Sequence, residues 1–269
     1  MRVLQAGKHL AWGITGALAL VATAHADDTT DGDGTWASRA LAGYSKTGGN
    51  TDTSSGNALF HIAHTWDQWK FLFGVDGFYG STAGVTTAQS WDSYFQANYN
   101  ISDRLYWFGK LSATSNKFSG FVYQDVVSTG VGYSFIKTDA TKFDGQIGIG
   151  ERWIKTAQFQ TDPLGGIIGD SYFTMPSERD TVVDATLKLD HSFNSLTKII
   201  AAYEIDSGSN NTMQTGSVSL QVKMSDRLGL SIGYQLTTNS NPPPGIGKSS
   251  SLESVSLTYT LKNKNLAPE

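Results

Sequence analysis

Apolar and polar residues alternate with a period of two along most of the chain. Over residues 217–224, 228–236 and 254–261, an apolar side chain stands at nearly every second position, with polar or small residues between. Because successive side chains of a strand point to opposite faces, this pattern predicts strands with one apolar and one polar face. The pattern recurs upstream and predicts nine more strands: 39–45, 57–65, 71–79, 92–99, 105–114, 127–135, 143–153, 183–190 and 198–206.

The links between these segments alternate between short and long. Short links are expected at 67–68, 102–103, 137–140, 194–195 and 225–226, and longer ones, rich in Gly, Ser and Thr, at 47–55, 81–89, 117–124, 156–178, 207–212 and 238–251. Outer-membrane barrels have an even number of strands of about ten residues, short periplasmic turns and longer outer loops. The chain is therefore predicted to be a transmembrane antiparallel β-barrel of about twelve strands.

A soluble lectin-like β-sandwich is the competing fold, because it also alternates and also carries surface aromatic residues. Aromatic residues near the predicted strand ends favour the barrel, since such rings gather where a membrane meets water. They are Trp36, Trp66, Trp69, Trp91, Tyr99, Trp107 and Trp153.

The N-terminus has the features of a secretory signal peptide. Arg2 and Lys8 precede an apolar run from Leu10 to Ala22, and Ala24-His25-Ala26 fits an A-x-A cleavage site. We therefore expect residues 1–26 to be removed and residues 27–269 to form one outer-membrane domain. Removing two basic residues and no acidic ones takes the formal net charge from −4 to −6. This weakly acidic balance argues against a nucleic-acid partner.

The chain has no cysteine, 29 glycines and only 16% charged residues. An exported protein without disulfides depends on backbone pairing and burial for its stability, which a closed barrel provides. Its mean hydropathy of −0.24 is polar for a membrane protein. This value is expected if one face of every strand lines an aqueous lumen.

Three segments carry a resemblance to a known family. They are Gly43 to Asp52, a tyrosine-ended strand running into a glycine turn; Gly148 to Trp153 (GIGERW); and Asn239 to Lys248, with its Pro-Pro-Pro-Gly run. With these the chain resembles the YdiY-like family of salt-induced outer-membrane proteins, whose domain has no assigned function. The resemblance implies a role in salt or osmotic stress. The chain departs from the family at its end, where a polar tail, 262–269, follows the last strand.

An outer-membrane hydrolase acting on lipid or peptide is the alternative function. Such an enzyme needs a nucleophile and a base within hydrogen-bond reach. His61 and His64 stand three apart on one strand, which puts them on opposite faces and argues against a shared metal site, and His191 is expected at a solvated periplasmic turn. We therefore predict no enzyme, cofactor or metal. Gly145, Gly148 and Gly150 lie within a strand and suit close packing rather than nucleotide binding.

The charged residues on the polar faces are the candidate lumen lining. Pairs such as Asp184 with Asp190 and Glu204 with Asp206 are interpreted as part of a mixed-charge ladder rather than as acid-base catalysts. The near-equal number of acids and bases predicts weak ion selectivity, if the lumen conducts. The candidates are Asp76, Asp92, Lys110, Asp144, Arg152, Asp184, Lys188, Lys198, Glu204 and Lys223.

The hypothesis from sequence is a narrow porin-like or envelope-integrity barrel in the bacterial outer membrane. Its expected partners are outer-membrane lipid, the barrel-assembly machinery and, if the lumen is open, small solutes. The loop from Asp162 to Glu178 has several apolar residues and is left with three interpretations: an inward plug, an outer ligand site, or a cover over the rim.

Overall fold

A computed structural model describes residues 35–47, 53–116, 120–161, 167–225, 228–243 and 246–261. The described residues form thirteen strands, β1 (Thr35–Thr47), β2 (Thr53–Trp66), β3 (Trp69–Thr82), β4 (Val85–Asn100), β5 (Leu105–Asn116), β6 (Phe121–Lys137), β7 (Thr141–Thr161), β8 (Ile167–Thr174), β9 (Glu178–Ser192), β10 (Thr197–Gly208), β11 (Thr212–Lys223), β12 (Leu228–Asn239) and β13 (Ser249–Leu261). The predicted signal peptide, 1–26, lies outside the described residues.

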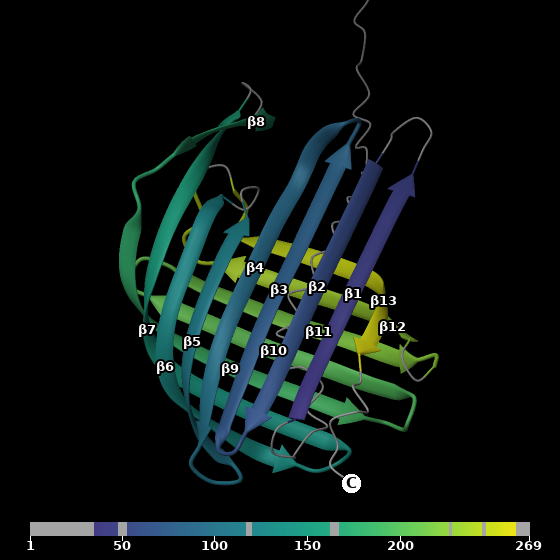
Figure 1. Cartoon of the computed structure of the whole chain (residues 1–269). Coiled ribbons are helices and arrows are strands. Elements are labelled where there is room, and N and C mark those ends of the chain that lie inside the picture. Colours follow the sequence, from purple (N-terminus) through teal and green to yellow (C-terminus); the bar gives the residue numbers. More distant parts are fainter. Residues whose placement is uncertain are drawn as a thin grey trace, which may run out of the picture.

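Twelve of these strands close into a ring. Sequence neighbours pair antiparallel, β1 pairs with β13, and β7 pairs with both β6 and β9. The remaining strand, β8, pairs with the end of β7 and stands above the rim in Figure 1. The prediction of a twelve-stranded antiparallel barrel is confirmed. Among the described residues, no helix is long and apolar enough to cross a membrane.

The barrel has an apolar exterior and a polar interior. On β9, Val183 and Leu187 are 45% and 46% exposed, whereas Asp184 and Lys188 between and beside them are 0% and 8% exposed. A soluble fold places these residues the other way round, because water favours the polar face. The inversion is the pattern expected of strands whose outer face meets lipid.

The two ends of the barrel differ. At one end, here called the turn end, β1 begins, β13 ends and the short links lie: 67–68, 101–104, 138–140, 193–196 and the described residues 224–225 of the β11–β12 link. By the rule for outer-membrane barrels this end faces the periplasm. The opposite end, here called the loop end, carries the remaining connections.

Two expectations about the loop end were wrong. Residues 81–89 were predicted to be a long loop, yet β3 and β4 continue to a two-residue turn at Ala83 and Gly84, whose φ angles are 51° and 79°. Strands of the ring are 12 to 21 residues long rather than about ten. Where a strand extends beyond the membrane, neither of its faces contacts lipid and neither must be apolar. The alternation of apolar and polar residues that predicts a strand is therefore lost in these segments.

Candidate functional site

The candidate site is the lumen, where side chains meet across the barrel. Lys110 on β5 donates from Nζ to Glu204 Oε1 on β10 at 2.7 Å and to Asp184 Oδ2 on β9 at 3.1 Å. In the ring, β6 and β7 lie between β5 and β9. These ion pairs therefore cross the lumen instead of following the ladder of adjacent strands. A second contact between non-adjacent strands joins Gln96 on β4, which donates from Nε2, to Gln146 Oε1 on β7 at 3.2 Å.

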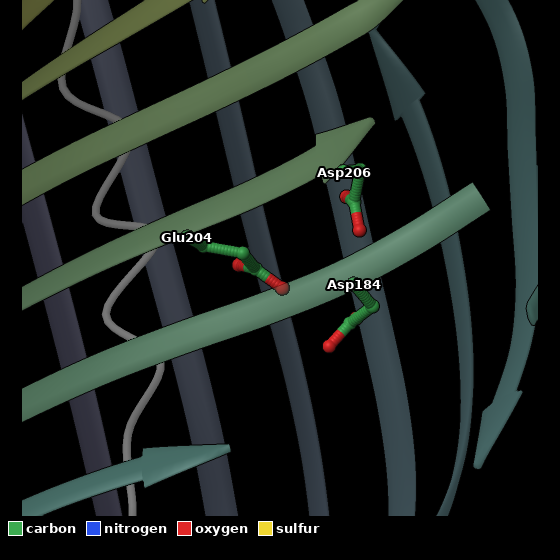
Figure 2. Close-up of side chains that lie close together, drawn as sticks. All are labelled: Asp184, Glu204 and Asp206. Atoms are coloured by element: carbon green, nitrogen blue, oxygen red, sulfur yellow. The ribbon is translucent and has the colours of Figure 1, made fainter. Parts of the chain in front are cut away.

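Three carboxylates gather beside Lys110. Ligand oxygens of Asp184, Glu204 and Asp206 all lie within 4.8 Å of one another, and Figure 2 shows the three side chains on two adjoining strands. Asp184 and Asp206 stand directly opposite each other in the β9–β10 ladder, an arrangement that like charges make unfavourable. The group is called the acidic cluster below. Carboxylates so arranged suit a cation, and the Lys110 ammonium fills that role, so we assign no metal here.

A second pair of carboxylates faces the lumen from β3 and β4. Asp76 stands opposite Asp92 in the ladder, and its Oδ2 lies 2.7 Å from His61 Nε2. His61 is 0% exposed and Asp76 is 6% exposed. The imidazole of His61 thus provides a hydrogen-bond partner for Asp76, one of the two carboxylates.

The loop end of the lumen is held by a buried arginine. Arg152 donates from Nη2 to Asp180 Oδ2 at 3.0 Å and to the carbonyl of Asn211 at 2.9 Å. Asp180 also accepts the Ser209 hydroxyl at 2.7 Å. Because Ser209 and Asn211 form the link between β10 and β11, these bonds fix that link over the lumen.

The remaining predicted lining residues lie toward the turn end. Asp144 accepts the Ser134 hydroxyl and stands opposite Lys188, which is 8% exposed. Lys198 lies 3.8 Å from Asp190 near the rim. Lys223, at the last position of β11, is exposed. The ten candidates therefore form several levels along the barrel and not one cluster.

Charge is unevenly divided among these levels. Asp184 and Glu204 pair with Lys110, Asp206 lies beside them and Asp92 borders the same cavity, whereas Lys188 stands opposite Asp144 and Lys198 lies at the rim. The near-balance counted along the sequence does not describe the middle of the lumen, where carboxylates are in excess.

A cavity of about 570 Å³ adjoins the acidic cluster. Its polar side carries the charged residues Asp92, Lys110, Glu204, Asp206 and Lys248, together with Gln124 and Thr186. Apolar side chains face it from other strands; they are Leu72, Phe78, Tyr94, Phe121, Val126 and Met213. Cavities of this size accommodate small organic ligands.

The described residues of the link between β12 and β13, 240–243 and 246–248, are here called the strap; they border this cavity and cross the mouth of the barrel. Asn241 donates to the Asn211 side chain at 3.3 Å and to the Asn210 carbonyl at 3.2 Å. Pro243 lies against Gly120: a Cβ built there would meet Pro243 Cγ at 2.6 Å. Since β13 and β6 occupy opposite sides of the twelve-stranded ring, the strap spans the opening.

The described part of the loop from Asp162 to Glu178, for which the sequence left three interpretations, does not fold into the lumen as a plug. Residues up to Thr161 continue β7, and β8 pairs back on it, so this region extends the β7 hairpin beyond the rim (Figure 1). Residues 162–166 lie outside the described residues. The inward connection is the strap.

The histidines and glycines have local explanations. His64 stacks on Trp36 at a centroid distance of 4.1 Å on the outer face, whereas His61 points inward. His191 lies within β9 rather than in a turn, and its Nδ1 is 2.8 Å from the Thr141 hydroxyl. A Cβ built on Gly148 would meet Phe108 Cζ at 2.9 Å, so this glycine permits close packing.

Three residues important to the lumen, Gln96, Gln146 and Asp180, were not among the predicted lining. Asp206, two positions after Glu204, was already placed on the lumen face by the alternation. Gln96 and Gln146 also share the inward parity, but an amide on a polar face carries no signal of a partner 50 residues away. Asp180 was missed because it lies between the predicted loop, 156–178, and the predicted strand, 183–190.

Comparison with known proteins identifies the family. The model of a family described as "Protein of unknown function, DUF481" matches residues 40–261, from the first strand of the ring to the last. The chain belongs to the DUF481 family. The resemblance to YdiY is confirmed as well: the chain is 23% identical over 209 residues to "Uncharacterized protein YdiY" of Escherichia coli K12, covering 75% of this chain and 73% of that protein.

Solved structures similar to this DUF481 protein include two porins and a translocator domain. The NanC porin has a TM-score of 0.43 at 14% identity, covering 82% of this chain and 97% of its own. The KdgM porin has 0.41 at 12%, covering 84% and 99%. The translocator domain of the autotransporter NalP from Neisseria meningitidis has 0.46 at 13%, covering 83% and 87%. The closed ring with its apolar exterior identifies an integral barrel of the bacterial outer membrane.

Proposed function

We propose that the protein is a narrow outer-membrane channel for small polar solutes, and that it prefers cations. The observation that carries this proposal is the excess of carboxylates around Lys110 in the middle of the lumen. A passing ion there meets the carboxylates of Asp92, Asp184, Glu204 and Asp206 and the ammonium groups of Lys110 and of Lys248, which borders the same cavity. Rings of carboxylates favour cations in a narrow pore, because field lines concentrate between walls of low dielectric constant.

The same arrangement predicts that solutes pass through the barrel slowly. Side-chain contacts across the lumen, together with the strap at the mouth, leave a restricted path instead of a wide aqueous pore. Barrels of eight strands are filled and those of sixteen are open, so a ring of twelve lies between the two. Conduction through such a lumen depends on the lining side chains.

The purified protein in planar bilayers tests this proposal. With a KCl gradient, the reversal potential is expected to lie toward the equilibrium potential of K⁺. Glu204→Gln and Asp206→Asn should each move it toward that of Cl⁻. Glu151→Gln is the matched control, because Glu151 pairs with the exposed Arg179 on the outer face of the barrel.

The outcomes are distinct. A reversal potential at zero or toward Cl⁻ contradicts the cation preference, and a correctly folded barrel without conductance contradicts the channel. A role in salt or osmotic stress stays a prediction from the family resemblance. We do not propose a hydrolase, because His61 is fully buried and His64 stacks on Trp36 outside the lumen.

A further inference from the structure

We infer that the cavity beside the acidic cluster binds a small organic cation that has an apolar or aromatic body, such as an arylalkylammonium ion. This inference rests on the proposed channel, since it names the class of solute that the same lumen would take. It is carried by three features of one cavity: its negative side, its apolar side and its unsatisfied polar groups.

The negative side selects the charge of the ligand. Asp92, Glu204 and Asp206 all border the cavity. Lys110 donates to Glu204 and Asp184, but Asp206 Oδ1 is buried without a hydrogen-bond partner in the part of the chain that the structure describes. A protonated amine would supply the missing donor, and an anion would meet repulsion from every carboxylate.

Buried polar groups supply an independent indication of a ligand. Gln124 and Thr186 border the cavity and are only 8% and 7% exposed. Within the described residues, Gln124 Oε1 and Thr186 Oγ1 have no hydrogen-bond partner. Buried polar atoms are normally paired, so these two are available to a ligand that brings N–H or O–H groups.

The apolar side selects the body of the ligand. Phe78 and Phe121 are 7% and 5% exposed and border the same cavity, as do Tyr94 and Met213. Aromatic side chains pack against rings and bury apolar groups, which favours an amine attached to a ring over a bare ion. The cavity of about 570 Å³ has room for such a molecule.

Three probes applied to the full-length protein in detergent separate these features. Phenethylammonium combines charge and ring, ethylammonium has the charge without the ring, and phenylacetate has the ring with the opposite charge. By titration calorimetry, phenethylammonium should bind at least about tenfold more tightly than either comparison probe. Equal binding of phenethylammonium and ethylammonium, binding of phenylacetate, or no binding of phenethylammonium would overturn the inference.

Two variants assign the binding to this cavity. Phe78→Ala should weaken phenethylammonium about tenfold and leave ethylammonium unchanged, whereas Asp206→Asn should weaken both cations. Glu151→Gln on the outer face should change neither. Each variant is first checked for the heat-dependent shift in gel mobility typical of folded barrels. If both variants bind phenethylammonium as the native protein does, the cavity is not the site.

The same titration distinguishes this inference from the proposed function. If phenethylammonium binds and the variants respond but no current flows in bilayers, the channel fails and the binding site stands. If cation-selective current flows and phenethylammonium neither binds nor blocks it, the binding site fails and the channel stands.

Discussion

Lys110 Nζ lies 2.7 Å from Glu204 Oε1, although β6, β7 and β9 separate the two strands in the ring. The lysine side chain is 12% exposed and that of Glu204 is 19% exposed, so neither partner is fully hydrated. We expect the pair to stabilise the barrel across its lumen, and its ammonium group partly neutralises the acidic cluster. It therefore links the stability of the fold to the charge of the proposed path.

Replacing Lys110 by Met should affect both properties. The variant leaves Asp184, which is 0% exposed, without its cation, and loss of one partner of a buried ion pair costs about 3 kcal/mol. Urea unfolding in lipid vesicles should show this loss, and the reversal potential should move closer to that of K⁺. A double variant, Lys110→Met with Glu204→Gln, should recover part of the stability. An unchanged unfolding midpoint in the single variant would show that the pair does not stabilise the barrel.

Asp180→Ala should loosen the loop end. Asp180 is the carboxylate partner of Arg152, whose side chain is 1% exposed, and it holds Ser209 in the β10–β11 link. The expected loss is about 3 to 5 kcal/mol on urea unfolding, because a charged guanidinium is left buried. Faster cleavage within 209–211 by an added protease should accompany it. Glu151→Ala, which breaks an exposed pair, is the control and should leave both readouts unchanged.

Gly148→Ala should destabilise the barrel wall. The added methyl would lie 2.9 Å from Phe108 Cζ and 2.6 Å from the Thr129 carbonyl oxygen, and backbone atoms yield little. Overpacking of this kind costs about 1 to 3 kcal/mol, which a lower urea midpoint would reveal. Gly77→Ala is the matched control, since nothing lies within 4 Å of its built Cβ. Equal midpoints for the two variants would contradict the packing role of Gly148.

The outer loops mark the limit of prediction from sequence. Ala83 and Gly84 form a tight turn between long strands. The sequence around them predicts a loop instead, because Ser, Thr and Gly occupy both odd and even positions and no alternation is visible. In the same way, an inward plug was one of three interpretations of the loop around Tyr172 and Phe173, where apolar residues concentrate. The strap that crosses the mouth instead lies in a link with three consecutive prolines, 242–244, and its contacts with Asn211 and Gly120 join distant parts of the chain.

The sequence by itself determined the class of fold, the twelve strands of the ring, the short links of the turn end and the face on which residues such as Asp184 and Lys188 lie. These properties are local: the period of two follows from strand geometry, and lipid outside the barrel imposes apolar residues on one face. Only the tertiary structure decided that Lys110 meets Glu204, that the acidic cluster adjoins a cavity, and that the strap crosses the opening. Such contacts depend on how the ring closes and on which residues of distant strands lie at the same height in the barrel. The alternation along one strand contains no information about either.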